Sequence, residues 1–379
     1  MRLIFLGFIS MIVLLNAYVC ARYTALVVAA GIPIWLFRTV YALFVFSFFS
    51  SIFFQDALLV HPRLNDAVTF VLTIYLGIFI FSFAGFFIAD ATRLLGKFLP
   101  VSGALRSSLQ KLYAHGLVVL AVAIVLTCYG MWNAKQVHVK EYAVTIAKHA
   151  PIERLDLLLL SDLHLGTAIR EKELGEIVRR ANALSPDVVC IAGDLFDHAT
   201  TRALMESAAH SLGELKSKYG VYFVFGNHEY YLGDEREAVK GIIASGVAVL
   251  ADESVIIGDG VYILGRKDAT DTRRLQIPDL LRAEEIDITK PVILLDHQPR
   301  DLKTAEAADV DLMLSGHTHA GQITPFDLLT GLFNEMLYGI RRSGNFHAIV
   351  SSGTGVWRFP IRVGSRNEMV LIRITFKKD

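Results

Sequence analysis

The sequence predicts an N-terminal multi-span α-helical membrane region followed by an α/β domain of the layered, α+β sandwich kind. Two observations lead to this fold class. The 379-residue chain is 53% hydrophobic, and its mean hydropathy is +0.46. Most of the apolar excess lies before residue 135, and it exceeds what soluble globular domains show. From about residue 150 onward, short apolar runs alternate with amphipathic stretches, as strands and helices do in α/β domains.

Composition excludes several classes of protein. The chain carries 37 basic and 37 acidic residues, so its formal net charge is zero and we expect no nucleic-acid partner. Its three cysteines, Cys20, Cys128 and Cys190, are far apart and odd in number. They therefore predict neither a disulfide framework nor a thiolate metal site.

Four apolar stretches precede the α/β part. None of them shows the polar face that a helix of a soluble protein presents, and a membrane helix needs about 20 such residues. We therefore divide the chain into a transmembrane region of about four helices (1–134), a polar connector (135–150) and an α/β domain (151–379). The apolar stretches are Leu3–Val19, Ala25–Phe54, Val68–Ile88 and Gly116–Trp132.

The first two stretches leave alternatives open. Leu3–Val19 is either a cleaved signal peptide or a first span, and the apolar stretches that follow favour the span. Ala25–Phe54 is longer than one crossing needs and contains Pro33 and Arg38. We expect an interfacial or tilted lead-in that ends near Arg38, and then a span.

Basic residues in the short connections predict the orientation of the spans. The second connection is the least basic, and the third is the richest, with Arg93, Lys97, Arg106 and Lys111. Placing the basic connections in the cytoplasm puts both termini outside it. The prediction is an integral protein of the cell membrane whose C-terminal domain is extracytoplasmic.

Five short apolar runs after residue 150 each end in side chains that bind metals or transfer protons. The first run, Leu155–Asp162 (LDLLLLSD), reads as a buried strand because most of its residues are aliphatic, and it stops at Ser161-Asp162. Open α/β sheets bind ligands at the carboxyl ends of their strands, so we expect the five ends to meet. In chain order the runs lead to Asp162 and His164, Asp194 and Asp197, Asn227 and His228, His297, and His317 and His319.

The segments between these runs predict helices. Arg170–Leu184 has apolar residues at helical spacing and stops at Ser185-Pro186. Ala203–Lys218 and Glu235–Ser245 have the same character, whereas residues 348–376 are β-rich. The alternation predicts βαβ units within a layered domain.

The donor atoms at the strand ends predict a metal site. Mixed oxygen and nitrogen donors suit Mn, Fe or Zn better than calcium, which takes oxygen alone. Seven donors are too many for one tetrahedral ion, but they suit two divalent ions about 4 Å apart that share a carboxylate. Such a pair clamps a phosphoryl group and generates hydroxide near neutral pH, so the expected substrate is a phosphoester. The seven are Asp162, His164, Asp194, Asn227, His297, His317 and His319.

The same residues resemble the five sequence blocks of the calcineurin-like metallophosphoesterase superfamily, in the family's order and over residues 152–376. Ser161-Asp162-Leu163-His164 and the run GHTHAGQ from Gly316 to Gln322 are most similar to the membrane-associated bacterial phosphoesterases. The blocks are Asp162-x-His164, Gly193-Asp194-x-x-Asp197, Gly226-Asn227-His228-Glu229, His297 and Gly316-His317-x-His319. A motif match is a hypothesis that its structural context must confirm.

The resemblance implies a role for each residue. Asp162, His164 and His319 would hold one metal, and Asn227, His297 and His317 would hold the other. Asp194 would bridge the two. His228 would donate a proton to the leaving oxygen and stabilise phosphoryl charge, with Asp197 orienting it. Asp296 is not a family ligand, and we expect it behind the ligands or at the surface.

The leading hypothesis is a membrane-anchored enzyme with two divalent ions (Mn, Fe or Zn) that hydrolyses phosphodiesters with a metal-bridging hydroxide. Phosphomonoesters and lipid or cell-envelope phosphates are further substrate classes, and the lipid bilayer is the expected partner. The alternative is a non-catalytic membrane sensor or assembly protein that retains the fold, which the intact ligand set disfavours. A transporter is also disfavoured, because the apolar stretches carry few ionisable residues.

Other residues leave their roles open. His198, beside Asp197, lines the cleft or is an ordinary surface histidine. Arg341, Arg342 and Arg358 bind an anionic substrate or form a solvated face. The apolar segment Phe326–Leu337 forms a lid, lies against the bilayer or packs in the core.

Overall fold

The computed structural model describes residues 2–54, 58, 61–96, 98, 103, 116–166, 168–197, 200–232 and 235–377. The chain forms two compact units, residues 1–132 and residues 133–379. The third predicted connection beyond Gly96, with Lys97, Arg106 and Lys111, lies almost wholly outside the described residues, as does His198.

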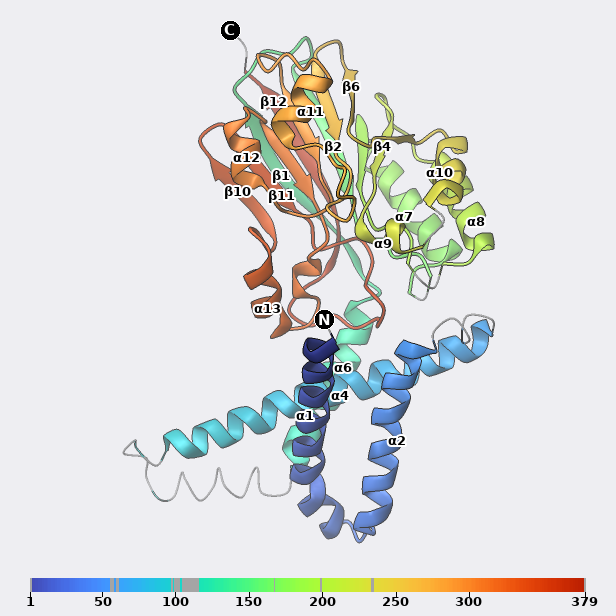
Figure 1. The fold of residues 1–379 in the computed structure, drawn as a ribbon, viewed down its shortest axis with the longest axis vertical. Helices are drawn as coiled ribbons and strands as arrows, with labels where there is room; N and C mark the ends of the chain where they lie inside the picture. The colour runs from blue at the N-terminus through green and yellow to red at the C-terminus, as the bar shows by residue number, and fades with distance from the viewer. Residues whose placement is uncertain are drawn as a thin grey trace. The chain divides into compact units, whose positions relative to one another are not determined.

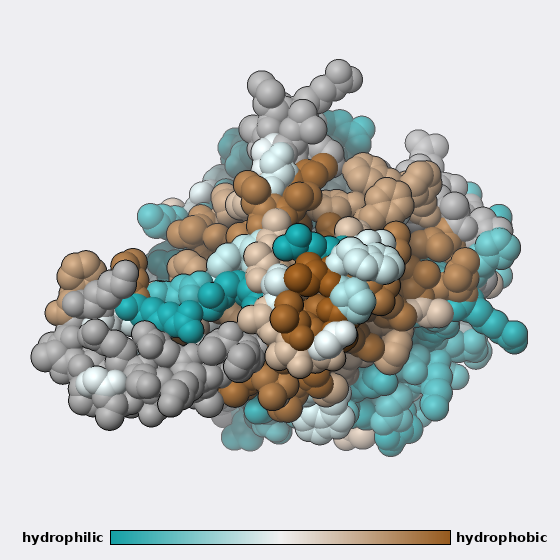
Figure 2. All heavy atoms as spheres, turned by 90° about the horizontal axis from the view of Figure 1, so that it is seen from below, coloured by the Kyte–Doolittle hydropathy of each residue, from teal (hydrophilic) through white to brown (hydrophobic). Residues whose placement is uncertain are grey.

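Within the described part of residues 1–133, four apolar helices follow one another (Figure 1). Three of them are long and apolar enough to cross a membrane, and α6 is shorter. Many large apolar side chains on these helices are exposed, and much of the face seen in Figure 2 is brown. Such a surface is costly in water and suits a lipid environment. The helices are α1 (Arg2–Ala29), α2 (Ile34–Phe53), α4 (Pro62–Leu95) and α6 (Leu117–Asn133).

The bounds of the first two helices differ from the expectation. Helix α1 continues without interruption past Val19 to Ala29, and Arg38 lies inside α2 rather than before it. The break comes at Pro33, which immediately precedes α2. Proline has a fixed φ and no N–H, so it begins a helix more readily than it continues one.

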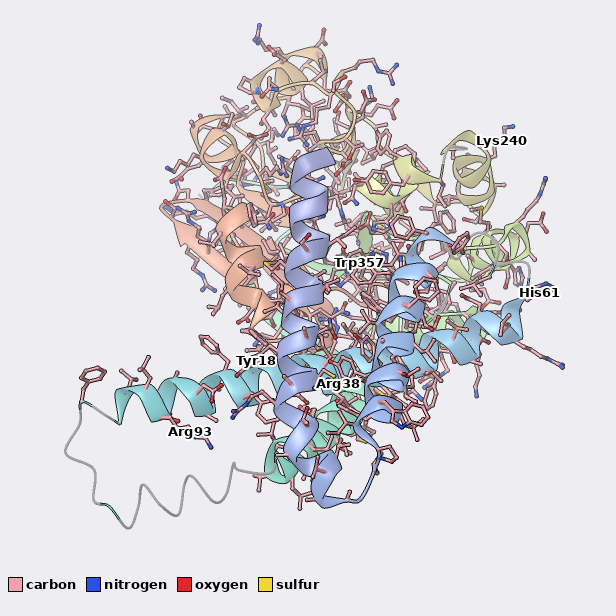
Figure 3. The ribbon with its side chains drawn as sticks, turned by 60° about the horizontal axis from the view of Figure 1, so that its bottom comes forward. Tyr18, Arg38, His61, Arg93, Lys240 and Trp357 are labelled. Atoms are coloured by element: carbon pink, nitrogen blue, oxygen red, sulfur yellow. The ribbon has the colours of Figure 1, made fainter. Side chains whose placement is uncertain are left out.

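Because α1 is longer than expected, it carries a charge among its apolar residues. Arg22 lies 3.1 Å from Asp90 of α4, and the hydroxyl of Tyr18, a residue labelled in Figure 3, donates to the same carboxylate. Arg93 approaches Asp90 to 3.6 Å. Charged side chains in apolar helices pair with one another because an isolated charge there is costly.

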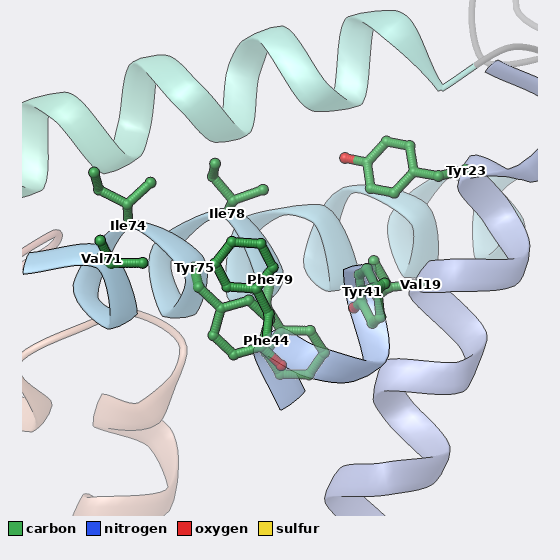
Figure 4. A pocket seen from close by; sticks show the side chains of 9 residues that line it. All are labelled: Val19, Tyr23, Tyr41, Phe44, Val71, Ile74, Tyr75, Ile78 and Phe79. Atoms are coloured by element: carbon green, nitrogen blue, oxygen red, sulfur yellow. The ribbon is translucent and has the colours of Figure 1, made fainter. Parts of the chain in front are cut away.

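Polar and aromatic side chains also join the first three helices. The amide oxygen of Asn16 accepts hydrogen bonds from Tyr41 (3.0 Å) and Tyr75 (2.7 Å). The rings of both tyrosines line a pocket of about 250 Å³ whose wall is made of nine apolar or aromatic side chains (Figure 4). This pocket lies among helices of the apolar unit and holds none of the predicted site residues.

The second unit is built on two six-stranded sheets. In the first sheet every neighbouring pair is parallel except β12 with β2. Its order is β1 (Val137–Ile146), β12 (Asn367–Phe376), β2 (Arg154–Leu160), β3 (Val188–Ala192), β4 (Val221–Val224) and β5 (Ala248–Val249).

In the second sheet the inner strands are parallel, and the strand at each edge is antiparallel to its neighbour. Its order is β10 (Gly339–Ser343), β11 (Phe346–Val350), β9 (Leu312–Ser315), β8 (Val292–Leu295), β7 (Val261–Gly265) and β6 (Glu253–Ile257).

The two sheets pack face to face, with helices on their outer faces, as the predicted sandwich requires (Figure 1). In β2, Leu157 and Leu159 face the core between the sheets, whereas Leu158 and Leu160 face the helices. A strand that is buried on both faces needs a continuous aliphatic run, which explains its composition. The covering helices are α7 (Glu171–Ala183), α8 (Arg202–Gly213) and α10 (Glu235–Ala244) on the first sheet, and α11 (Ile277–Ala283) and α12 (Leu302–Ala307) on the second.

The predicted polar connector is largely a strand. Residues 137–146 form β1, which pairs in parallel with β12 along its whole length. Only Val144 and Ile146 of β1 are buried. Polar residues such as Lys140 and Glu141 interrupt its apolar residues because the strand is solvated over most of its length, so its sequence resembles a connector.

Candidate metal centre

The predicted site residues follow the carboxyl ends of five strands, and the parallel pairing brings those ends together. Strands β2, β3 and β4 are parallel neighbours in the first sheet, and β8 and β9 are parallel neighbours in the second. Parallel strands end at one edge of a sheet. The loops after all five strands therefore contribute to one site at the edge shared by the two sheets.

The first cluster consists of Asp162, His164 and His319, whose ligand atoms all lie within 4.8 Å of one another. Nε2 of His164 is 3.0 Å from Nε2 of His319. The same His319 nitrogen is 3.5 Å from a carboxylate oxygen of Asp162. Burial lowers the pKa of His164 to about 4 and holds the pKa of His319 well below its usual value. Neutral imidazoles are the form that binds cations, so this cluster fits a metal.

The second cluster consists of Asp194, His297 and His317, again within 4.8 Å. Nδ1 of His297 donates to the backbone oxygen of Ala192 (2.8 Å), which directs Nε2 toward Asp194 at 3.2 Å. Fixing one imidazole nitrogen on a carbonyl and presenting the other is how proteins orient metal-binding histidines. Burial lowers the pKa of His317 to about 4, so it too is neutral at pH 7.

Asp194 links the two clusters. One of its carboxylate oxygens lies 3.2 Å from Nε2 of His297 and 3.7 Å from Nε2 of His164. Burial by itself would raise the pKa of Asp194, but the charge and hydrogen bond of His297 outweigh burial and hold that pKa below its usual value. A carboxylate that stays ionised between two sets of nitrogens has the position of a bridging ligand.

Asn227 supplies an independent indication of a missing partner. It begins α9 (Asn227–Tyr231), directly after β4 and Phe225-Gly226, and its side chain is 8% exposed. Its amide oxygen has no hydrogen-bond partner within the described part of the chain. A buried amide oxygen without a partner is costly, so this atom fits a cation ligand.

His228 and Asp197 lie beside the first cluster. Nδ1 of His228 is 3.2 Å from a carboxylate oxygen of Asp197, and its ring meets the ring of His164 edge-on at 4.7 Å. Burial alone would lower the pKa of His228, but the Asp197 hydrogen bond and the nearby carboxylates raise it above its usual value. The imidazole therefore keeps its proton at higher pH than a free histidine, as a proton donor must.

Backbone conformation contributes to the site as well. Five of the predicted residues have positive φ: Asp162, His164, Asp194, His317 and His319, with values from 47° to 72°. L-residues rarely adopt this region, and strained backbones cluster at functional sites. Two glycines allow the close packing, because a Cβ at Gly226 would lie 2.1 Å from Asp194 Oδ1 and one at Gly316 would lie 2.2 Å from Asp162 Oδ2.

Two residues that support the site were not singled out from the sequence. The buried carboxylate of Glu229 accepts backbone N–H bonds from Asp194 (3.0 Å), Phe196 (3.0 Å) and Gly226 (2.7 Å). Its position in the Gly226–Glu229 block was the only available signal. The buried guanidinium of Arg362 contacts His319, and no sequence feature marked it.

Asp296 was expected either behind the ligands or at the surface. It is fully buried, so the surface position is excluded. Its carboxylate pairs with Arg266 (3.1 Å) and Arg274 (3.3 Å). Despite these cations, burial raises its pKa to about 6. Asp296 therefore belongs to an ion-pair network behind His297 and is not a member of either cluster.

Comparison with known proteins adds to this geometry. The family model for calcineurin-like phosphoesterases matches residues 155–321, a range that contains all nine predicted site residues. A transmembrane protein with metallophosphoesterase domain from Danio rerio is 33% identical over 314 residues, which cover 78% of this chain and 71% of that protein. An uncharacterized metallophosphoesterase from Campylobacter jejuni is 31% identical over 356 residues, 91% of this chain and 92% of its own length. One from Helicobacter pylori is 36% identical over 231 residues, 60% of this chain and 61% of that protein.

Proposed function

Since the chain belongs to the calcineurin-like metallophosphoesterases, we propose that it is a membrane-anchored hydrolase of phosphodiester bonds that uses two divalent metal ions. The observation that carries the proposal is the position of Asp194 between two clusters of largely buried histidines and carboxylates. Phosphomonoesters are the second substrate class to be tested. The phosphoester and the lipid bilayer are the proposed partners, and no nucleic acid is among them.

We assign the ligands by cluster. Asp162, His164 and His319 would hold one ion. Asn227, His297 and His317 would hold the other, with Asp194 shared. Oxygen and nitrogen donors suit Mn²⁺, Fe or Zn²⁺. Two bound ions would neutralise phosphoryl charge and lower the pKa of a shared water enough to make it a nucleophile near neutral pH.

The residues around the ions would handle protons and orientation. His228, protonated and held by Asp197, would donate to the leaving oxygen as the ester bond breaks, because an alkoxide is a poor leaving group. Glu229 would hold the loops that carry Asp194 and Asn227 in position, because its carboxylate accepts hydrogen bonds from the backbone N–H groups of Asp194 and Gly226. Holding reacting groups at fixed positions accounts for a large part of enzymatic rate enhancement.

A direct assay tests the proposal. Full-length protein in detergent is incubated with bis(p-nitrophenyl) phosphate and Mn²⁺, Fe²⁺ or Zn²⁺, with and without chelator. We expect metal-dependent release of nitrophenol that Asp194→Asn abolishes, while Asp279→Asn, an exposed carboxylate on α11, has no effect. Folded protein with two bound ions and no turnover of any phosphoester would refute the hydrolase and favour the non-catalytic sensor.

We further propose that the protein resides in the cell membrane and that the domain is extracytoplasmic, on the basis of the basic residues in the connections. A cysteine placed at the exposed position Ile256 of β6 would test this orientation. An impermeant maleimide should label Ile256→Cys in intact cells. Labelling only after the cells are lysed would place the domain in the cytoplasm.

A further inference from the structure

Helix α13 (Phe326–Phe333) has none of its residues buried, although five of its eight residues are large and apolar. Leu332 and Phe333 are 78% and 79% exposed, the highest values among these five. Core packing, one of the three expectations for this segment, is therefore wrong for the helix. An apolar helix that packs against no core marks an interaction surface. The five side chains are Phe326, Leu328, Leu329, Leu332 and Phe333.

The five apolar side chains form one face. At 3.6 residues per turn, their positions fall within an arc of about 160° around the helix axis. The other side carries Asp327, Thr330 and Gly331. A one-sided apolar face is typical of helices that lie in the plane of a lipid surface with that face among the acyl chains.

Helix α13, labelled in Figure 1, packs against the segment that carries the candidate ligand His319. Its Asp327 packs so closely on Gly321 that a Cβ on that glycine would lie 2.2 Å from the Asp327 Cα. Gly321 belongs to the short helix η1 (His319–Gly321), which begins with the candidate ligand His319. Whatever α13 binds is therefore held next to the first cluster.

Exposed aromatic residues accompany the helix. The side-chain nitrogen of Gln322 donates to the backbone oxygen of Trp357 (3.2 Å). The side-chain oxygen of Gln322 accepts from the backbone N–H of Trp357 (3.0 Å). The half-exposed ring of Trp357, labelled in Figure 3, meets the ring of His228 edge-on, with 6.4 Å between the ring centroids. Trp and Tyr favour the lipid–water interface, and Tyr338, five residues after α13, is also exposed.

The same chain indicates what covers this face. Three of its helices are long and apolar enough to cross a membrane, and only residues 134–136 connect α6 to β1. The domain is thus covalently held at a lipid surface. We propose that α13 inserts its apolar face into this lipid surface and presents the phosphoester head group of a membrane lipid to the metal centre. The substrate part of this proposal rests on the proposed hydrolase function, whereas the insertion of α13 does not.

Insertion is tested on full-length protein in phosphatidylcholine–phosphatidylglycerol vesicles. Cys20 and Cys128 are replaced by serine, and Cys190 is buried. Leu332→Cys is labelled with bimane, and quenching by lipids brominated in their acyl chains is measured. The control is Ile256→Cys with the same label, because Ile256 is 58% exposed on β6, the strand at the edge opposite β10 in the second sheet.

Strong quenching at position 332 with little at position 256 is the expected result. Equal, weak quenching at both positions would overturn the proposal. Because this readout needs no turnover, it remains decisive if the protein hydrolyses nothing.

The substrate is tested with Leu332→Glu/Phe333→Glu, compared with Ile256→Glu. Turnover of bis(p-nitrophenyl) phosphate should stay within about twofold, while the apparent KM for phospholipids in mixed vesicles, followed by mass spectrometry, should rise about tenfold or more. Equal losses on both substrates would make α13 a structural support of the site and refute the proposal. Turnover of the soluble ester with no hydrolysis of vesicle lipid by the unmodified protein would refute the lipid substrate but not the hydrolase.

Discussion

Nη2 of Arg362 lies 3.2 Å from Nδ1 of His319. The guanidinium packs against the Nδ1 edge of the ring, and the Nε2 edge faces His164. The same guanidinium donates to the backbone oxygens of Ser352 (2.6 Å), Gly355 (2.8 Å) and His319 (3.1 Å). One buried cation thus fixes both the ring and the backbone of a candidate ligand.

Replacing Arg362 should destabilise the fold and the first cluster together. Arg362→Lys cannot reach all of these acceptors, and each buried carbonyl left without a donor costs about 1–3 kcal/mol. We expect the free energy of unfolding, measured by fluorescence in detergent, to fall by several times the cost of one such carbonyl. Arg373→Lys, at an exposed pair with Glu141, should change it little, because such pairs are screened by solvent. Equal effects of the two variants would contradict the proposed role of Arg362.

Glu229→Gln should weaken metal binding without touching a ligand. A glutamine side chain has one acceptor oxygen where Glu229 uses both oxygens to hold three N–H groups, so the loops that carry Asp194 and Asn227 lose support. Loss of such supporting partners lowers metal affinity about 10–100-fold. The measurement is a Mn²⁺ titration by calorimetry. Glu176→Gln, an exposed residue of α7, serves as the control and should bind as the unmodified protein does.

Gly316→Ala should displace Asp162. The new methyl group would lie 2.2 Å from a carboxylate oxygen of Asp162 and 2.7 Å from Cβ of Ser161, so the loop must move. We expect the metal content, measured by mass spectrometry, to fall by about one of the two ions per chain, the number a dinuclear site holds. Gly175→Ala is the matched control, because nothing lies within 4 Å of the position that its new methyl group would take on α7. A Gly316→Ala protein that retains both ions would contradict the close packing of Gly316 against the Asp162 carboxylate.

The pH dependence of turnover should depend on Asp197. Asp197, Asp194 and Glu229 raise the pKa of His228 against the opposing effect of burial. A required acid is lost as the pH rises through its pKa, so the alkaline limb of the rate profile should lie above the usual histidine value. Asp197→Asn removes the largest raising contribution, and the alkaline limb should therefore move to lower pH. A limb that does not move would exclude His228 as the acid held by Asp197.

Much of the site could be predicted because each candidate ligand directly follows an aliphatic run. Asp162 after β2 and Asp194 after β3 are placed by the strands themselves, since parallel strands end at one edge. The supporting residues have no such signal. Arg362 lies 43 positions from His319, and most of its bonds go to backbone atoms whose positions only the folded chain defines.

The errors of prediction have related causes. In the edge strand β1 only Val144 and Ile146 are buried, and its polar and apolar residues do not alternate regularly, so the hydrophobic pattern alone could not detect it. The first apolar stretch was expected to end at Val19, but α1 continues to Ala29, and Arg22 within the added part pairs with Asp90. In each case a partner distant in sequence decided the outcome.

Strand β12 has a consequence for the order of events in biosynthesis. It lies between β1 and β2, so a strand synthesised long after both of them separates the two in the sheet. At about 5–20 residues per second, the interval between the synthesis of Leu160 and Asn367 is roughly 10–40 s. During this time β2 lacks a neighbour on one side, and the loop carrying Asp162 lacks Gly353, Gly355 and Arg362 behind it. The loop that carries Asp162 therefore gains its full set of packing partners only after β12 has been synthesised.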